Sequence, residues 1–247
     1  MPLEPLASSS QKKSLFSIFL DAVFPILCLA CQKRGAWICA DCQKKIPLRI
    51  EQECPLCKKE SHILGATCFE CKGSTALDGI FSATYYQIPI VARAIHTFKY
   101  RFVPGVSVPL SEILIDALTK GNLPLPDVIL PVPLHKRRLR FRGFNQASLL
   151  AKNISENITP EIPIPFYENA LKRIRYTKPQ IKTLSRTERL ANLSNAFILD
   201  PALTPDIKGK SIWLIDDVAT TSATLEECAK VLKKSGAKSV YGIVIAR

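Results

Sequence analysis

Two carboxylates and four hydroxyl side chains lie within nine residues near the end of the chain. Asp216 and Asp217 follow an apolar run at 212–215 that is typical of a buried parallel strand. The hydroxyls precede a helical pattern at 225–234, and they are Thr220, Thr221, Ser222 and Thr224. A helix N-terminus attracts phosphate, and carboxylates accept hydrogen bonds from sugar hydroxyls or bind Mg²⁺. The stretch predicts a site for a phosphorylated sugar; the alternative is an ordinary strand–turn–helix with a hydroxyl cap.

Eight of the nine cysteines occur as four Cys-x-x-Cys pairs. They are Cys28, Cys31, Cys39, Cys42, Cys54, Cys57, Cys68 and Cys71. Each pair can place two thiolates on one tetrahedral ion, so two pairs complete a closed Cys₄ site with a structural role. We expect one or two zinc ions, with sequential pairing simpler than an interleaved pattern. Clustered thiols of this kind indicate a reducing compartment, and we expect the cytoplasm.

A strongly basic segment follows a second predicted strand at 127–132. Five of the seven residues at 136–142 are cations: Lys136, Arg137, Arg138, Arg140 and Arg142. We expect a loop here, and anions bind beyond the carboxyl ends of parallel strands in open α/β sheets. The basic segment is therefore predicted to face an anionic ligand. The alternatives are a solvated basic loop, or a nucleic-acid patch with Phe141 and Phe144 as stacking groups.

The composition of the 247 residues indicates a globular protein, with 47% hydrophobic and 22% charged residues. A net charge of +13 favours an anionic partner: a phosphorylated small molecule, a nucleic acid or an acidic protein. The apolar segment at 14–30 is interrupted by Asp21 and Pro25 and is short for a membrane span. We expect no span, and a short helix that packs on the cysteine block.

The elements that would position these residues indicate an α/β fold. Strands are expected at 80–87, 127–132, 166–174, 197–199, 212–215 and 240–245. Helices are expected at 92–100, 106–118, 147–154 and 225–234, with another from about residue 185. We expect a lead segment at 1–20, a cysteine domain at 21–76 and an α/β domain at 77–247. The polar, basic stretch around Gln180 is typical of a mobile loop that closes over an active site.

The motifs together resemble the ComF family, in which an N-terminal zinc ribbon precedes a type I phosphoribosyltransferase domain. The resemblance covers 21–247. Besides the cysteine pairs, its pieces lie at 99–101, 131–135, 142–146, 177–180, 184–186, 195–197 and 216–224. It implies a parallel sheet flanked by helices. Ser222 stands where the family usually has glycine, so a positive φ at this position would cost stability.

The resemblance also implies a ligand, phosphoribosyl pyrophosphate (PRPP) with Mg²⁺. Asp216 and Asp217 would hold the ribose hydroxyls, Arg137 and Arg138 would face pyrophosphate, and Gln180 would belong to the closing loop. The implied PRPP-binding loop consists of Asp216, Asp217, Val218, Ala219, Thr220, Thr221, Ser222, Ala223 and Thr224.

The implied reaction is the displacement of pyrophosphate from C1 of PRPP by an acceptor that the sequence does not identify. The alternative is a non-catalytic PRPP- or nucleotide-sensing adaptor. The same resemblance implies a role in natural competence and DNA uptake, with single-stranded DNA and a competence helicase as candidate partners.

Overall fold

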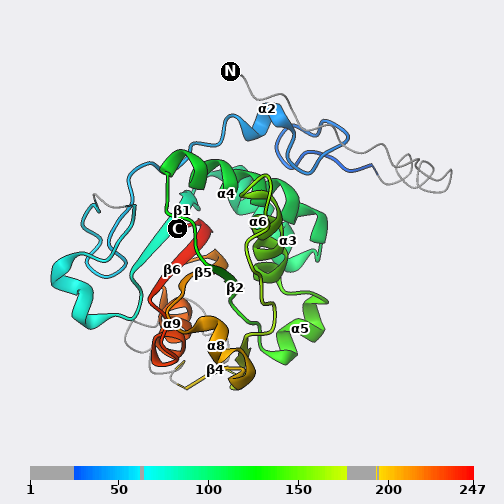
Figure 1. The fold of residues 1–247 in the computed structure, drawn as a ribbon. Helices are drawn as coiled ribbons and strands as arrows, with labels where there is room; N and C mark the ends of the chain where they lie inside the picture. The colour runs from blue at the N-terminus through cyan, green and yellow to red at the C-terminus, as the bar shows by residue number, and fades with distance from the viewer. Residues whose placement is uncertain (1–24, 62–63, 177–192, 194) are drawn as a thin grey trace.

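The computed structural model describes residues 25–61, 64–176, 193 and 195–247. A sheet of four parallel strands forms its centre, in the order β1-β6-β5-β2 (Figure 1). The strands are β1 (Gly79–Thr84), β2 (Val128–Pro131), β5 (Ser211–Val218) and β6 (Ser239–Ala246). Because all four run in the same direction, the loops that follow them gather at one edge of the sheet.

The strand β5 is longer than the apolar run in its sequence. Asp216 pairs with Val244 of β6 and Val218 pairs with Ala246, so the strand continues through both acids. The predicted strand at 212–215 was therefore too short. The backbone ladder, which does not depend on side-chain polarity, holds the two carboxylates on a rigid element.

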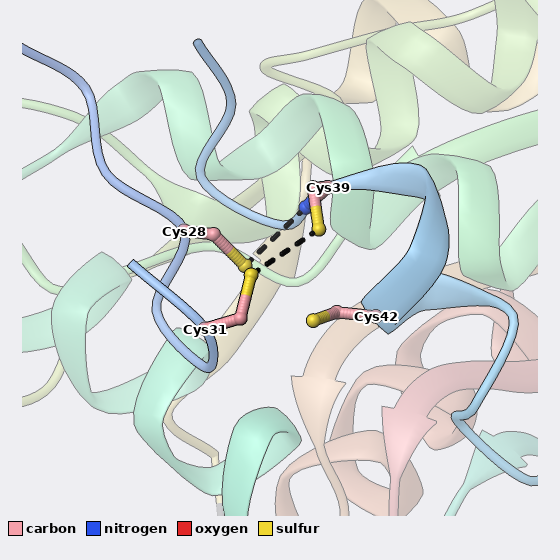
Figure 2. A group of neighbouring side chains, drawn as sticks. All are labelled: Cys28, Cys31, Cys39 and Cys42. Atoms are coloured by element: carbon pink, nitrogen blue, oxygen red, sulfur yellow. Dashed lines mark hydrogen bonds between the residues drawn. The ribbon is translucent and has the colours of Figure 1, made fainter. Parts of the chain in front are cut away.

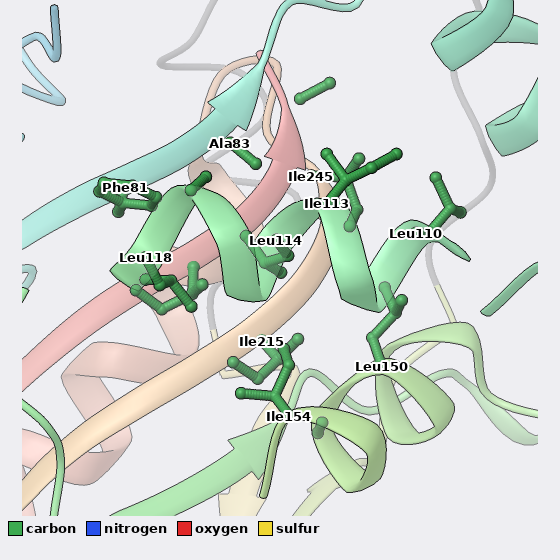
Figure 3. Close-up of a cluster of buried hydrophobic side chains, with 14 of the residues drawn as sticks. Phe81, Ala83, Leu110, Ile113, Leu114, Leu118, Leu150, Ile154, Ile215 and Ile245 are labelled. Carbon is green, nitrogen blue, oxygen red and sulfur yellow. The ribbon is translucent and has the colours of Figure 1, made fainter. Parts of the chain in front are cut away.

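Three helices cover one face of the sheet: α3 (Pro89–Tyr100), α4 (Ser107–Gly121) and α6 (Gln146–Asn157). Figure 3 shows Leu114 of α4 and Ile154 of α6 directed toward Ile215 and Ile245 of the sheet. Successive side chains of a strand point to opposite faces, so Leu214 belongs to the core of the other face.

The other face is covered by α9 (Ala223–Lys234) and by an antiparallel pair, β3 (Leu171–Arg173) and β4 (Phe197–Leu199). The strand expected at 166–174 is shorter than predicted, with only an isolated bridge from Phe166 to Ile129 before β3. The remaining short elements are α2 (Ala40–Gln43), η1 (Phe69–Ser74), η2 (Pro104–Val106), η3 (Pro201–Leu203) and α8 (Thr204–Ile207).

The basic segment after β2 is a helix, α5 (Lys136–Arg142), and the predicted loop was wrong. His135 caps its start, because Nδ1 accepts a hydrogen bond from the Arg137 backbone N–H at 3.2 Å. Gly143 ends it in the left-handed region, with φ of 78°. Five cations in two turns leave no apolar period to read, so the two caps were the only local signal.

The cysteine-rich segment packs on the helices α3 and α4 and along the outer edge of the sheet. Ile38 and Ile46 are buried in the core that contains α4. The Gln52 side chain donates to the Ser82 carbonyl and accepts from the Ser82 N–H, both at 3.0 Å, as a neighbouring strand would. Glu226 of α9 accepts hydrogen bonds from the Thr75 hydroxyl and, at 2.9 Å, from the Ala76 N–H.

Several predictions fall outside the described residues. These are the lead segment at 1–20, the start of the short helix at 14–30, the closing loop with Gln180, and the helix expected from about residue 185. Within the described residues, no helix is long and apolar enough to span a bilayer.

Candidate functional site

A cavity of about 530 Å³ opens at the carboxyl ends of β2 and β5. Asp216 and Asp217 of β5 line it together with cations from three other elements. Those cations are Lys99 of α3, Arg137, Arg138 and Arg142 of α5, and Arg173 of β3. The structure therefore brings the predicted acids and the predicted Arg137 and Arg138 to one cavity.

A close ion pair joins α3 to the end of β5. Lys99 Nζ lies 2.9 Å from Asp217 Oδ1, and Asp217 is buried. Burial acts to lower the pKa of Lys99, but the carboxylates of Asp217 and Asp216 outweigh it and raise that pKa. Lys99 was not among the predicted site residues, although the 99–101 motif that contains it contributed to the family resemblance.

Asp216 is the carboxyl group that can change charge near neutral pH. Its Oδ1 accepts a hydrogen bond of 2.8 Å from the Asp217 N–H. Burial and the adjacent carboxylate of Asp217 raise the pKa of Asp216 to about 7. A cation bound at this carboxylate would favour the ionised form and lower the pKa again.

The arginines of the cavity wall are held by aromatic and amide groups. The Arg137 guanidinium lies over the Tyr176 ring, 5.1 Å from its centroid, and the Arg142 guanidinium lies 5.7 Å from the centroid of Tyr100. Arg142 Nη1 also donates to Gln146 Oε1 at 3.0 Å. These contacts restrain the side chains without neutralising them, so the wall can still bind an anion.

A second hollow of about 50 Å³ lies at the N-terminus of α9, lined by Asp216 and residues 218–225. Ser222 adopts φ of 62° and ψ of 8°, in the left-handed region. The position therefore has the positive φ under which serine costs stability. Its hydroxyl is also buried and makes no hydrogen bond within the described part of the chain.

The eight clustered cysteines form two groups, one from Cys28 to Cys42 and one from Cys54 to Cys71, each with its four sulfurs within 4.8 Å of one another. Sequential pairing is thus confirmed. Figure 2 shows the first group, in which the Cys31 and Cys39 sulfurs are 3.6 Å apart. In the second group Cys57 and Cys68 are 3.7 Å apart. Tetrahedral zinc at its usual bond length would separate sulfurs by about 3.8 Å, so each group could hold a zinc ion.

The backbone favours thiolate at one buried cysteine of each group. Burial acts to raise the pKa of Cys28, but N–H donors that include Cys31 and Cys39 lower it to about 6. For Cys54, burial is likewise outweighed and the pKa falls to about 6. The Cys39 N–H, 3.4 Å from Cys28 Sγ, is one such donor. Thiolate ligands oriented by N–H donors are the chemistry that a structural zinc ion requires.

No family model matches the chain. Competence protein F of Haemophilus influenzae (strain ATCC 51907 / DSM 11121 / KW20 / Rd) is 32% identical over 235 residues, which cover 91% of this chain and 98% of that protein. The chain belongs to the ComF family. The DNA utilization protein YhgH of Escherichia coli (strain K12) is 31% identical over 226 residues, 87% of this chain and 94% of that protein. Competence protein ComFC of Bacillus subtilis (strain 168) is 30% identical over 220 residues, 85% and 84% of the two chains.

Two solved structures are also similar to this ComF protein. Glutamine PRPP amidotransferase from B. subtilis, complexed with ADP and GMP, matches 60% of this chain and 30% of its own, with a TM-score of 0.37 and 17% identity. The allosteric regulatory enzyme of purine biosynthesis matches 60% of this chain and 29% of its own, with the same TM-score of 0.37 and 17% identity.

The predicted fold class of this ComF protein is confirmed. It is an α/β protein with a parallel sheet of four strands flanked by helices, and it carries two Cys₄ groups consistent with a small N-terminal zinc ribbon.

Proposed function

We propose that this ComF protein binds PRPP, a ribose that carries phosphate at one end and pyrophosphate at the other. One observation carries the proposal: two carboxylates stand between two separate places for anions. Asp216 borders both the arginine-lined cavity and the hollow at the start of α9. A ligand with a diol between two phosphate groups matches this order of anion site, carboxylates and anion site.

The 5′-phosphate would occupy the hollow formed by 218–225. The N-terminus of α9 directs backbone N–H groups toward this region, and its partial positive charge favours an anion. Thr220, Thr221 and Thr224 would add hydroxyl donors. Asp216 and Asp217 would accept from the ribose hydroxyls, as the family motif implies.

The pyrophosphate group would face Arg137, Arg138 and Arg142 of α5. Guanidinium groups suit phosphate because they donate paired hydrogen bonds in one plane. Carboxylate oxygens suit Mg²⁺, and Asp216 would be its ligand, since Asp217 is already paired with Lys99. Magnesium bound with PRPP would supply further neutralisation of the pyrophosphate charge.

The proposed reaction is substitution at C1 of PRPP. The acceptor's electron pair forms the new bond to C1 while the bond from C1 to the pyrophosphate oxygen breaks, and that oxygen keeps the bonding electrons. Arg137 and Arg138 would stabilise the negative charge that develops on pyrophosphate, and Asp216 and Asp217 would hold the ribose in place. Gln180 and its neighbours would close over the site and exclude water.

The cellular role that we infer follows from the relatives. Two of them are named competence proteins and a third a DNA utilization protein. We propose that this chain acts in competence and DNA uptake in the cytoplasm, with single-stranded DNA and a competence helicase as partners.

A second candidate function is a non-catalytic adaptor that senses PRPP or a nucleotide. The ion pair between Lys99 and Asp217 favours it, because a ligand that used Asp217 would have to share or replace that contact. The left-handed conformation of Ser222 also favours the adaptor, since serine places a side chain where the family usually has glycine. Both features would hinder the placement of the ribose and the 5′-phosphate that turnover requires.

Titration calorimetry with PRPP and Mg²⁺ tests the proposal. We expect saturable one-site binding to the wild type and its loss in the Asp216→Asn/Asp217→Asn variant. Asp116→Asn on the exposed side of α4 is the matched control and should bind as the wild type does. Ribose 5-phosphate and pyrophosphate should each bind more weakly than PRPP, because each fills only one anion site. Wild-type protein that fails to bind PRPP at millimolar ligand overturns both the phosphoribosyltransferase and the PRPP-sensing adaptor.

A pyrophosphate-release assay then separates the enzyme from the adaptor. Release with any acceptor base identifies a phosphoribosyltransferase. Binding of PRPP without release, across the common purine and pyrimidine bases, favours the adaptor.

A further inference from the structure

Exposed aromatic rings gather beside α5, at the mouth of the cavity. Phe141 of α5 is 72% exposed, Tyr100 at the end of α3 is 57% exposed, and Phe102 is 37% exposed. The Phe102 and Phe141 rings meet edge to face, with centroids 5.2 Å apart and planes at 88°. The fold therefore builds an aromatic surface from two segments and leaves much of it in water.

The backbone at Phe102 is strained in this arrangement. Its φ is 55°, in the left-handed region that bulky side chains avoid. Burial does not explain the strain, because the ring stays partly exposed. Strained residues that face solvent are candidates for function, and this one holds its ring against Phe141.

Cations surround the aromatic rings. Lys136, Arg137 and Arg140 are exposed on α5, and Arg101 is exposed beside Phe102. Within the described residues, none of these four forms an ion pair with a carboxylate. The surface thus combines uncompensated positive charge with ring faces that water solvates poorly.

We propose that α5 and residues 100–102 form a binding surface for single-stranded DNA. The bases stack on Phe141 and Phe102, and Arg140, Arg101 and Lys136 bind the phosphates. Stacking of bases on aromatic rings along a basic track is the general mode by which proteins hold single strands. The choice of DNA rests on the competence role proposed above.

A duplex fits this surface less well than a single strand. Its bases already stack on each other and their faces are not available to Phe141 or Phe102. An acidic protein would satisfy the arginines but would give the exposed rings no planar partner. Phe141 and five cations lie on a seven-residue helix, about 10 Å long, which suits a few nucleotides.

Fluorescence anisotropy with labelled oligothymidylates tests the surface. We expect Phe141→Ala to weaken binding roughly tenfold, and Phe102→Ala to weaken it less. Arg140→Ala should weaken binding and reduce the slope of log K against log salt by about 0.7. The matched controls are Ile162→Ala, an exposed apolar residue after α6, and Lys120→Ala at the end of α4; both should bind as the wild type does. Circular dichroism and a thermal melt confirm that each variant is folded.

Competition measurements distinguish the partners. A duplex of the same length and an acidic polypeptide should compete poorly with the oligothymidylate. Equal affinity for single strand and duplex, efficient competition by the acidic polypeptide, or unchanged binding by the Phe102→Ala/Phe141→Ala variant overturns the proposal.

The same variants separate this inference from the PRPP proposal. Phe102 and Arg140 do not line the cavity, whereas Asp216 and Asp217 do. Loss of DNA binding in Arg140→Ala with PRPP binding intact supports the surface alone. If the wild type binds DNA through Phe141 but does not bind PRPP, the surface stands and the PRPP proposal falls.

Discussion

Ser222 bears two local costs at the start of α9. Its left-handed φ is unfavourable for any residue with a Cβ atom, and its buried hydroxyl makes no hydrogen bond to the residues that the structure describes. Both costs sit in the loop that we propose binds phosphate. The missing family glycine indicated the first cost, on the condition that φ is positive at this position. The sequence could not show the second cost.

Replacing Ser222 should therefore stabilise the protein. We expect the free energy of unfolding of Ser222→Gly to exceed that of Ser222→Ala by about 1 kcal/mol. Both variants remove the hydroxyl, but only glycine relieves the backbone strain. Urea denaturation followed by circular dichroism measures the difference. If the alanine variant is as stable as the glycine variant, the left-handed conformation carries no cost.

Asp216 makes the stability depend on pH. Its pKa is about 7 in the folded protein and ordinarily 3.8, so the folded state binds the proton more tightly. The stabilisation by this proton is complete below about pH 4 and is lost as the pH rises to about 7. Asp216→Asn lacks the titration. We expect the stability of the wild type relative to this variant to fall steadily over that range.

Urea denaturation at a series of pH values checks this expectation. Asp116→Asn serves as the control, and its stability should follow that of the wild type at every pH. Parallel curves for the wild type and Asp216→Asn would show that the Asp216 carboxyl does not have a raised pKa.

At the residue scale, reasoning from the sequence identified the site residues that belong to a motif. It missed the site residues that reach the cavity from other elements of the fold. Asp216 was named from a local pattern, and Arg137 and Arg138 were named from the family resemblance. All three line one cavity. Lys99 and Arg173 reach the same cavity from α3 and β3. Their role depends on how these elements pack, and no local signal in the sequence specifies that packing.

Among the elements, α9 connects the proposed phosphate loop to the second cysteine group. Glu226 lies in the first turn of α9, is buried, and accepts two hydrogen bonds from the segment that leaves Cys71. Separation of the segment from the helix would break both of these hydrogen bonds to the carboxylate.

Loss of this connection should be costly. We expect Glu226→Ala to lower the free energy of unfolding by about 3 kcal/mol, since two hydrogen bonds to a charged group disappear. It should also speed proteolysis between Cys71 and β1. Glu156→Ala on the exposed side of α6 is the control, with a change near zero. Denaturation and timed protease digestion measure both effects, and protection equal to the wild type would mean that other contacts hold the segment.

Element prediction succeeded where the hydrophobic period was strong. The helices α3, α4, α6 and α9 and the strands β2 and β6 lie where the apolar spacing placed them. The helix α5 was missed because five of its seven residues are charged and leave no apolar period, so only its caps marked it. The end of β5 was missed because the backbone pairing with β6 extends past the last apolar residue.

Across the whole molecule, the cysteine groups and the sheet depend on each other. Ile38 of the first group's segment lies in the α4 core, and Gln52 before the second group completes the edge of β1. The sequence separated these parts into a cysteine domain and an α/β domain. Their mutual packing was not predictable, because it joins surfaces far apart along the chain.

We expect two zinc ions per chain. Cys31→Ala and Cys57→Ala should each reduce the content to one and lower the melting temperature, because each breaks a different Cys₄ group. Cys228→Ala is the control: this buried thiol lies on α9 outside both groups, and the zinc content should stay at two. Mass spectrometry of the metal measures the content. A wild-type content of one ion or fewer would contradict structural zinc in both groups.

The position of β6 between β1 and β5 has a consequence for synthesis on the ribosome. The strand β1 is made first of the four and β6 last, yet β6 is the sheet neighbour of β1. A nascent chain therefore carries β1, and the cysteine segment docked on it, without their main partner until the final strand emerges. Chain arrest or proteolytic loss of residues 239–247 would leave two unpaired strand edges, and such fragments should aggregate rather than retain half of the fold.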